Sequence, residues 1–124
     1  AWATIQEELG ISTSNEYTLD MLCAEKKLEK QFLYRFKLNT AENNKCIAIP
    51  YYNINKEFVR TRYRNSPDSK NKYYWGNDGT GTALYGEWSI NDYTDDHIVV
   101  VEGESDCWTL WNYRSSSNSV CLVV

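Results

Sequence analysis

The first third of the chain repeats its apolar residues at the spacing of a helix. Thr18 has the side chain of a good helix N-cap, and Asp20 places a carboxylate in the first turn, where the helix dipole favours it. Apolar residues recur at intervals of three or four, which places them on one side of a helix. They are Leu19, Leu22, Cys23, Phe32, Leu33 and Phe36, and upstream Trp2, Ile5 and Leu9 have similar spacing. We therefore predict that residues 1–40 form a helical lead-in.

The middle of the chain has the pattern of strands. The stretches 46–52 and 57–64 are rich in β-branched and aromatic residues and flank a short polar turn, which predicts two strands joined by that turn. Pro50 cannot donate a backbone hydrogen bond, so the first strand should lie at a sheet edge or carry a bulge. Residues 41–96 are predicted to form a small mixed α/β subdomain, with a linker at 89–96.

The C-terminal stretch combines both patterns. A β-branched strand at 98–101, a helix at 105–113 and an apolar strand at 120–124 predict a βαβ unit. Glu102 then follows the end of a strand, where open α/β sheets bind ligands. Since the last strand stops without a turn or a cap, we expect 97–124 to be the start of a domain cut from a longer polypeptide. The predicted fold class is α+β, with short N-terminal helices, a small antiparallel β subdomain and a partial α/β unit.

Charge is distributed unevenly along the chain. The net charge is −4, which argues against a general nucleic-acid coating protein. Residues 56–72 nevertheless carry six basic and two acidic side chains (6 − 2 = +4), whereas residues 92–106 carry six acidic side chains and no Lys or Arg. A basic face next to an acidic cluster is what a metal-dependent enzyme acting on phosphates requires.

Basic side chains alternate along the second predicted strand. Arg60, Arg62 and Arg64 are two residues apart, so they share one face at intervals of roughly 6.6 Å. They are candidates for a phosphate track, because the guanidinium fork matches phosphate oxygens, and Lys70 and Lys72 could extend it. The alternative is an exposed edge strand protected by its charge. The aromatic residues among these cations either stack on the bases of a single strand or fill a small β core.

Glu102 and Asp106 are the candidates for catalytic chemistry. Mg²⁺ prefers carboxylate oxygens and keeps several waters, so Glu102 could bind this metal or act as a base toward a nucleotide 3′-hydroxyl. Asp106 would be a weak ligand or an orienting group. The alternative is an ordinary βα turn, in which Gly103 permits the turn and the charges of Glu104 and Asp106 favour the helix N-terminus.

Other kinds of site and location are not supported by the sequence. The four cysteines form no Cys-x-x-Cys pair and His97 is the single histidine, so we expect no zinc site. Four reduced thiols are typical of a cytoplasmic protein. No apolar run approaches the ~18 residues of a transmembrane helix, and the N-terminus has no basic signal region. We therefore expect a cytoplasmic protein without membrane contact.

Five segments follow one another in a specific order along the chain. They are Ala48-Ile-Pro-Tyr-Tyr52, Val59-Arg-Thr-Arg-Tyr-Arg64, Lys72-Tyr-Tyr-Trp75, Leu84-Tyr-Gly86 and Val99-Val-Val-Glu-Gly-Glu-Ser-Asp106. This order resembles the N-terminal part of the catalytic core of bacterial and phage-type DNA primases, with the phage and mobile-element group as the closest. The resemblance covers about residues 17–124 and ends within the Toprim domain, whose first signature is an aliphatic strand followed by Glu-Gly-x-x-Asp.

The resemblance implies a parent protein that makes RNA primers on single-stranded DNA from ribonucleoside triphosphates. Glu102 matches the catalytic Toprim glutamate and Asp106 the aspartate of that motif. Both would hold Mg²⁺ or Mn²⁺ with aspartates beyond this chain, so the chain alone should be inactive. A replicative helicase, in cis or in trans, is a further implied partner. The residues assigned to nucleotide and template binding are Arg60, Arg62, Arg64, Lys70 and Lys72.

Two other function classes stay open. The basic and aromatic strands alone would serve a non-enzymatic single-stranded-DNA-binding module of a mobile-element replication protein. The Glu-Gly-x-x-Asp motif alone would also fit a Toprim nuclease or a topoisomerase relative.

Overall fold

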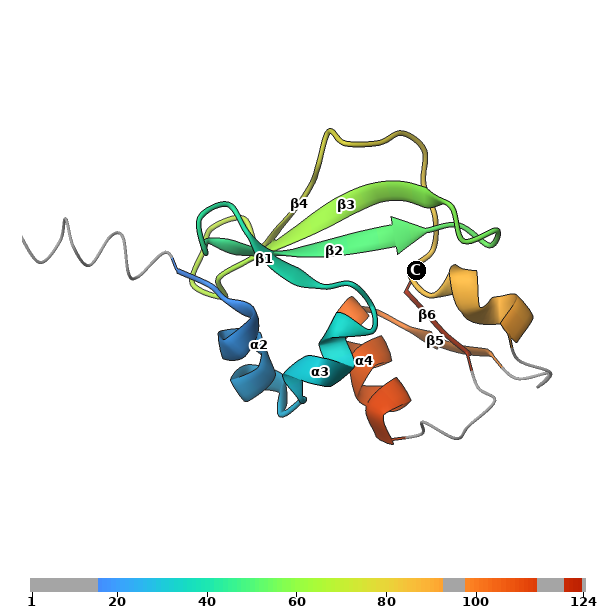
Figure 1. The fold of residues 1–124 in the computed structure, drawn as a ribbon, viewed down its shortest axis with the longest axis horizontal. Coiled ribbons are helices and arrows are strands. Elements are labelled where there is room, and N and C mark those ends of the chain that lie inside the picture. The colour runs from blue at the N-terminus through green and yellow to red at the C-terminus, as the bar shows by residue number, and fades with distance from the viewer. Residues whose placement is uncertain (1–15, 93–97, 114–119, 124) are drawn as a thin grey trace, which may run out of the picture.

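The structure, a computed structural model, describes residues 16–92, 98–113 and 120–123 (Figure 1). It confirms the α+β fold class predicted from the sequence. The predicted helix around Trp2 to Leu9, and His97, lie outside these residues. The elements, in chain order, are α2 (Leu19–Lys26), α3 (Lys30–Tyr34), β1 (Asn39–Ala41), β2 (Cys46–Tyr52), β3 (Phe58–Asn65), β4 (Tyr73–Trp75), a 3₁₀ helix η1 (Glu87–Asp92), β5 (Ile98–Val101), α4 (Glu104–Tyr113) and β6 (Val120–Val123).

Helix α2 begins at the N-cap that the sequence predicts and ends at a residue in the left-handed conformation. The Thr18 side chain accepts a hydrogen bond from the Met21 N–H at 3.3 Å, as the N-cap prediction requires. Lys27 adopts a left-handed conformation (φ 56°), and its N–H bonds to the Cys23 carbonyl, which ends the helix. Leu19 and Leu22 are buried, so the predicted apolar side of the helix faces the core.

Four antiparallel strands form the first sheet, in the order β1-β2-β3-β4. The long strands β2 and β3 are therefore interior, and the interpretation of β3 as an exposed edge strand is wrong. Pro50 is also in an interior strand, but β1 pairs with β2 only as far as Ala48. Pro50 thus lies where that side of β2 has no neighbouring strand, and a bulge follows between Tyr51 and Tyr52.

The segment after β4 runs back along β3. The Gly76 N–H bonds to the Thr61 carbonyl at 2.8 Å. The carboxylate of Asp78 accepts hydrogen bonds from both the N–H and the hydroxyl of Thr61. Gly79 lies so close to the strand that a Cβ atom there would stand 1.8 Å from the Val59 carbonyl oxygen. Only glycine permits this approach.

The second sheet is the parallel pair β5 and β6, joined through α4, which matches the predicted βαβ unit. The linker predicted at 89–96 is wrong in part, because Glu87–Asp92 is the 3₁₀ helix η1. Trp88 holds this helix in place: its ring packs against Tyr85 at 4.8 Å between centroids, and Tyr52 and Trp111 each lie 6.0 Å away. None of the helices in the described residues is long and apolar enough to cross a membrane.

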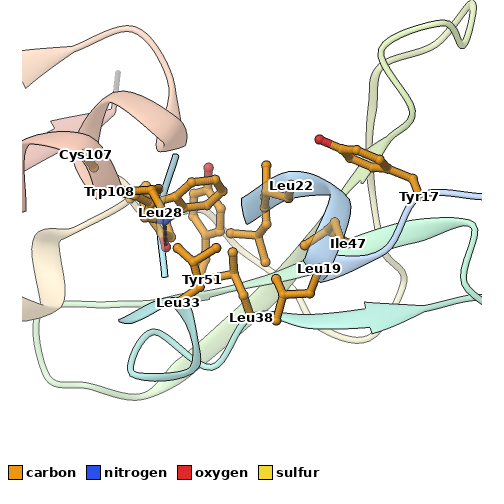
Figure 2. Packing of buried hydrophobic residues seen from close by; sticks show 12 residues of the cluster. Tyr17, Leu19, Leu22, Leu28, Leu33, Leu38, Ile47, Tyr51, Cys107 and Trp108 are labelled. Atoms are coloured by element: carbon orange, nitrogen blue, oxygen red, sulfur yellow. Dashed lines mark hydrogen bonds between the residues drawn. The ribbon is translucent and has the colours of Figure 1, made fainter. Parts of the chain in front are cut away.

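One core joins the two sheets. Helices α2, α3 and α4 lie on the same side of the antiparallel sheet (Figure 1), and their buried side chains meet those of β2 (Figure 2). Trp108 of α4 is fully buried, and its indole N–H donates to the Tyr85 hydroxyl at 2.8 Å. Trp111 packs against the same core, so α4 contributes two tryptophans to it.

Candidate nucleic-acid interface and adjoining carboxylates

The three arginines of β3, which we call the arginine row, share one face of the sheet, and that face is turned toward the helices. Arg64, Arg62 and Arg60 stand opposite Ile47, Ile49 and Tyr51 of β2. Residues that pair across antiparallel strands point to the same side, and these three β2 residues are buried in the core. The row therefore runs along the margin of the core, and its members differ in what surrounds them.

Arg64 is buried and neutralised at one end of the row. Its side chain donates to Glu25 (Nη2 to Oε2, 3.0 Å), to the Tyr17 hydroxyl (3.3 Å) and to the Tyr73 hydroxyl (2.8 Å). Burial raises the pKa of Tyr17 to about 12. Burial would also raise the pKa of Glu25, but the hydrogen bond from Tyr17 and the charge of Arg64 outweigh it, so that pKa is lowered. Arg64 thus fastens α2 to the sheet.

Arg62, in the middle of the row, forms an ion pair with Glu104 of α4. Its Nη1 donates to Glu104 Oε2 at 3.0 Å, and the Tyr51 hydroxyl donates to the same oxygen at 2.6 Å. The Glu104 side chain is 1% exposed and that of Arg62 is 26% exposed. Burial and the Glu104 charge raise the pKa of Tyr51 far above its ordinary value. Burial alone would lower the pKa of Arg62, but Glu104 and Tyr51 outweigh it and raise this pKa.

Sequence reasoning assigned Glu104 only to the helix N-terminus and missed this contact. A signal was present, because Glu104, Cys107 and Trp108 have the spacing of one helix face. The latter two are apolar and fully buried. A carboxylate on the apolar face of a helix needs a buried donor, and the arginines of β3 are the donors that the sequence offers.

Arg60, at the other end of the row, has no ion-pair partner in the described part of the chain. Its Nε atom is buried without a hydrogen-bond partner there. The guanidinium carbon lies 5.8 Å from the centre of the Trp75 ring, and Trp75 is 43% exposed. Arg60 is therefore the arginine of the row that no carboxylate holds by a hydrogen bond, and its charge contributes to the lowered pKa of the nearby Asp78.

Aromatic rings of β4 lie beside the row. The Arg62 guanidinium carbon is 4.3 Å from the centre of the Tyr73 ring and 5.6 Å from that of Trp75, and Arg64 is 5.7 Å from Tyr73. Both rings are more than one-third exposed. Cations and accessible aromatic rings in alternation are the combination that holds single-stranded nucleic acids, through phosphate contacts and base stacking.

Lys70 and Lys72 lie in the exposed segment between β3 and β4. Lys72 lines a pocket of about 230 Å³ together with Glu25, Lys26, Arg64 and Tyr73. The pocket therefore carries cations around the neutralised Arg64. Lys70 is not among its lining residues.

Glu102 and Asp106 lie at the turn from β5 into α4, and both are exposed. One oxygen of Asp106 accepts a hydrogen bond from the Gly103 N–H at 3.2 Å, which closes the turn. The described residues contain no group of three or more side chains able to hold a metal ion. Magnesium often takes only one or two carboxylates and completes its shell with waters and substrate phosphates. Glu102 and Asp106 therefore fit part of such a site.

The buried ion pair between Arg62 and Glu104 predicts a loss of stability when Glu104 is replaced. Replacement of Glu104 by Gln leaves Arg62 charged and short of a partner, so the free energy of unfolding should fall by on the order of 3 kcal/mol. Urea unfolding of the Glu104→Gln variant measures this. Asp20→Asn, which breaks the exposed ion pair of Asp20 with Lys30, is the control and should change stability little. Equal losses for the two variants would contradict the assignment.

A second prediction concerns pH. The pKa of Glu25 is lowered in the folded protein, so its stabilising effect is complete above its ordinary value of 4.5 and is lost as the pH falls through the folded pKa. The difference in unfolding free energy between the wild type and Glu25→Gln should therefore be largest at neutral pH and shrink in acid. Urea titrations from pH 7 to pH 3 test this. A difference that does not change with pH would show that Glu25 acts through packing.

Comparison with known proteins reaches the fold and no further. No family model matches the chain, and no curated protein matches it. Among solved structures it is similar to one described as "Structure of the DnaG primase catalytic domain bound to ssDNA", with 15% identity and a TM-score of 0.63. The match covers 93% of this chain and 51% of the other, so the chain spans about half the length of that domain. At this identity the likeness shows a primase-like fold.

Proposed function

We propose that this chain is part of the catalytic core of a DNA primase, in which Arg60, the unpaired end of the arginine row, and the rings of β4 bind single-stranded DNA. The observation that carries the proposal is the contact between Arg62 and Glu104. It joins the basic and aromatic sheet to the turn that presents Glu102. The primase-like fold supports the same assignment, because the similar structure is described as bound to single-stranded DNA.

The side chains suggest a division of work. Arg60 would donate to a phosphate of the template or of an incoming ribonucleoside triphosphate, while Trp75 would stack on a base. Glu102, exposed at the end of β5, would accept the proton of a 3′-hydroxyl or hold a metal ion, and Asp106 keeps the turn closed. Bound Mg²⁺ or Mn²⁺ would stabilise the charge that develops on the phosphate under attack.

A second candidate is a single-stranded-DNA-binding module without catalysis. The small number of carboxylates at the turn favours this candidate, since the described residues contain only part of a metal site. The two candidates share the arginine row and differ in the role of Glu102.

Replacement of Glu102 separates the two candidates. In the full protein that contains this chain, Glu102→Gln should abolish primer synthesis on single-stranded DNA and leave binding of an oligonucleotide intact, because Glu102 lies outside the arginine row. Incorporation of labelled ribonucleotides and fluorescence anisotropy measure the two effects. Glu42→Gln, an exposed glutamate between β1 and β2, is the control. Synthesis at the wild-type rate by Glu102→Gln would remove the catalytic assignment.

Oligonucleotide binding tests the proposed DNA contacts of Trp75 and Arg60. Trp75→Leu should weaken binding of oligo(dT) by about tenfold, because one base–ring stack contributes roughly 1–3 kcal/mol. Arg60→Gln should weaken it and flatten the logarithmic salt dependence by about 0.7. Phe58→Leu, on an equally exposed ring of β3, serves as the matched control. If the Phe58→Leu and Trp75→Leu variants bind the oligonucleotide with equal affinity, the bound DNA does not contact β4.

A further inference from the structure

A second basic and aromatic pocket contains none of the three arginines of the arginine row among its lining residues. Its volume is about 230 Å³. Three segments that are distant in sequence build it: the residues that follow α3, the end of β2 with the turn beyond it, and η1. Neither the sequence motifs nor the proposed primase site accounts for it.

The walls of this pocket are aromatic and held by neighbouring rings. Tyr52 and Trp88 meet edge to face, with ring centroids 6.0 Å apart and an angle of 82°. Phe36 stacks on Trp111 at 4.8 Å. The three lining rings are partly buried, so they are fixed in position and still reach the pocket. Fixed rings around a small space suit a flat ligand.

The rim of the pocket carries an excess of positive charge. Of its three cations, Lys56 is paired with Asp92 at 2.7 Å. Arg35 and Lys37 have no ion-pair partner among the described residues, and the Lys37 ammonium lies 5.2 Å from the centre of the Tyr52 ring. One carboxylate against three cations leaves the rim at 3 − 1 = +2, in a chain whose net charge is −4. The rim is therefore suited to an anion.

We infer that this pocket binds one nucleotide unit, with its base against the aromatic walls and its phosphate at Arg35 and Lys37. Accessible rings beside unpaired cations provide the two contacts that such a unit needs. The volume lies below the roughly 300–1,000 Å³ of pockets for drug-sized ligands, which favours a single base over a larger molecule. The unit can belong to a free nucleotide or to a nucleic-acid strand.

The backbone offers a variant that removes charge without harming the fold. Lys37 has a left-handed conformation (φ 62°), which glycine adopts without strain. Lys37→Gly should therefore keep or raise the melting temperature while it removes one of the two unpaired cations. Lys27, the C-cap of α2, has the same kind of conformation (φ 56°) and does not line this pocket, so Lys27→Gly is the matched control.

The test follows the indole N–H signal of Trp88 by NMR, assigned with Trp88→Phe, during titration with ATP and with an oligodeoxyadenylate. We expect the signal to shift, and Lys37→Gly to weaken the affinity roughly tenfold, the change for one lost charge-assisted hydrogen bond. Lys27→Gly should bind like the wild type. A shift with ATP alone indicates a free nucleotide, and a shift with the oligonucleotide indicates a nucleotide within a strand.

Two results would overturn the inference: a Trp88 signal that neither probe moves, or equal affinities for Lys37→Gly and Lys27→Gly. The readout is independent of the arginine row, because none of its three arginines lines this pocket. Trp75→Leu, which tests the ring beside that row, should therefore leave the Trp88 response unchanged. If the pocket does not bind a nucleotide, the proposed primase site is unaffected. If the primase proposal is wrong, the inference about the pocket is likewise unaffected.

Discussion

The arrangement of the two sheets depends on the contact of the buried Glu104 carboxylate with Arg62 and Tyr51. A charge with 1% exposure is tolerable only because Tyr51 and Arg62 both donate to it. Those donors belong to the antiparallel sheet, whereas Glu104 begins the helix that follows Glu102. Because the ion pair fixes the start of α4, it also fixes the position of the exposed turn at Glu102, two residues before Glu104. A group that must meet a metal or a phosphate gains from such support.

The arginine row shows how one repeated residue type can serve different ends. Arg64 is almost enclosed and bound by a carboxylate and two hydroxyls, Arg62 is partly exposed and bound by one carboxylate, and Arg60 has a buried donor left over. Neutralisation therefore decreases along the strand. Three adjacent free guanidiniums would repel one another, and pairing two of them lets the third remain available.

Local patterns in the sequence were sufficient for α2, β2, β3 and the βαβ unit, because periodicity and capping residues specify such elements. They could not reveal β1, whose three residues are a strand only through pairing with β2. They also described Glu104 as a helix-terminal charge, since its partners are 42 and 53 residues away in the chain. Alternation placed the arginine row on one face, but the buried partners in β2 decide which face that is.

The antiparallel sheet has outer strands of three residues beside inner strands of seven and eight, so long stretches of β2 and β3 have one open side. Each open stretch is blocked by different chemistry. Beside β2 it contains Pro50, which has no N–H to offer, and beside β3 the Asp78 carboxylate occupies the N–H of Thr61. The hydrogen bonds from Thr61 also lower the pKa of Asp78, so the block persists into mild acid. At these two positions a second molecule finds no backbone N–H to pair with, so strand addition along the open sides of β2 and β3 is hindered.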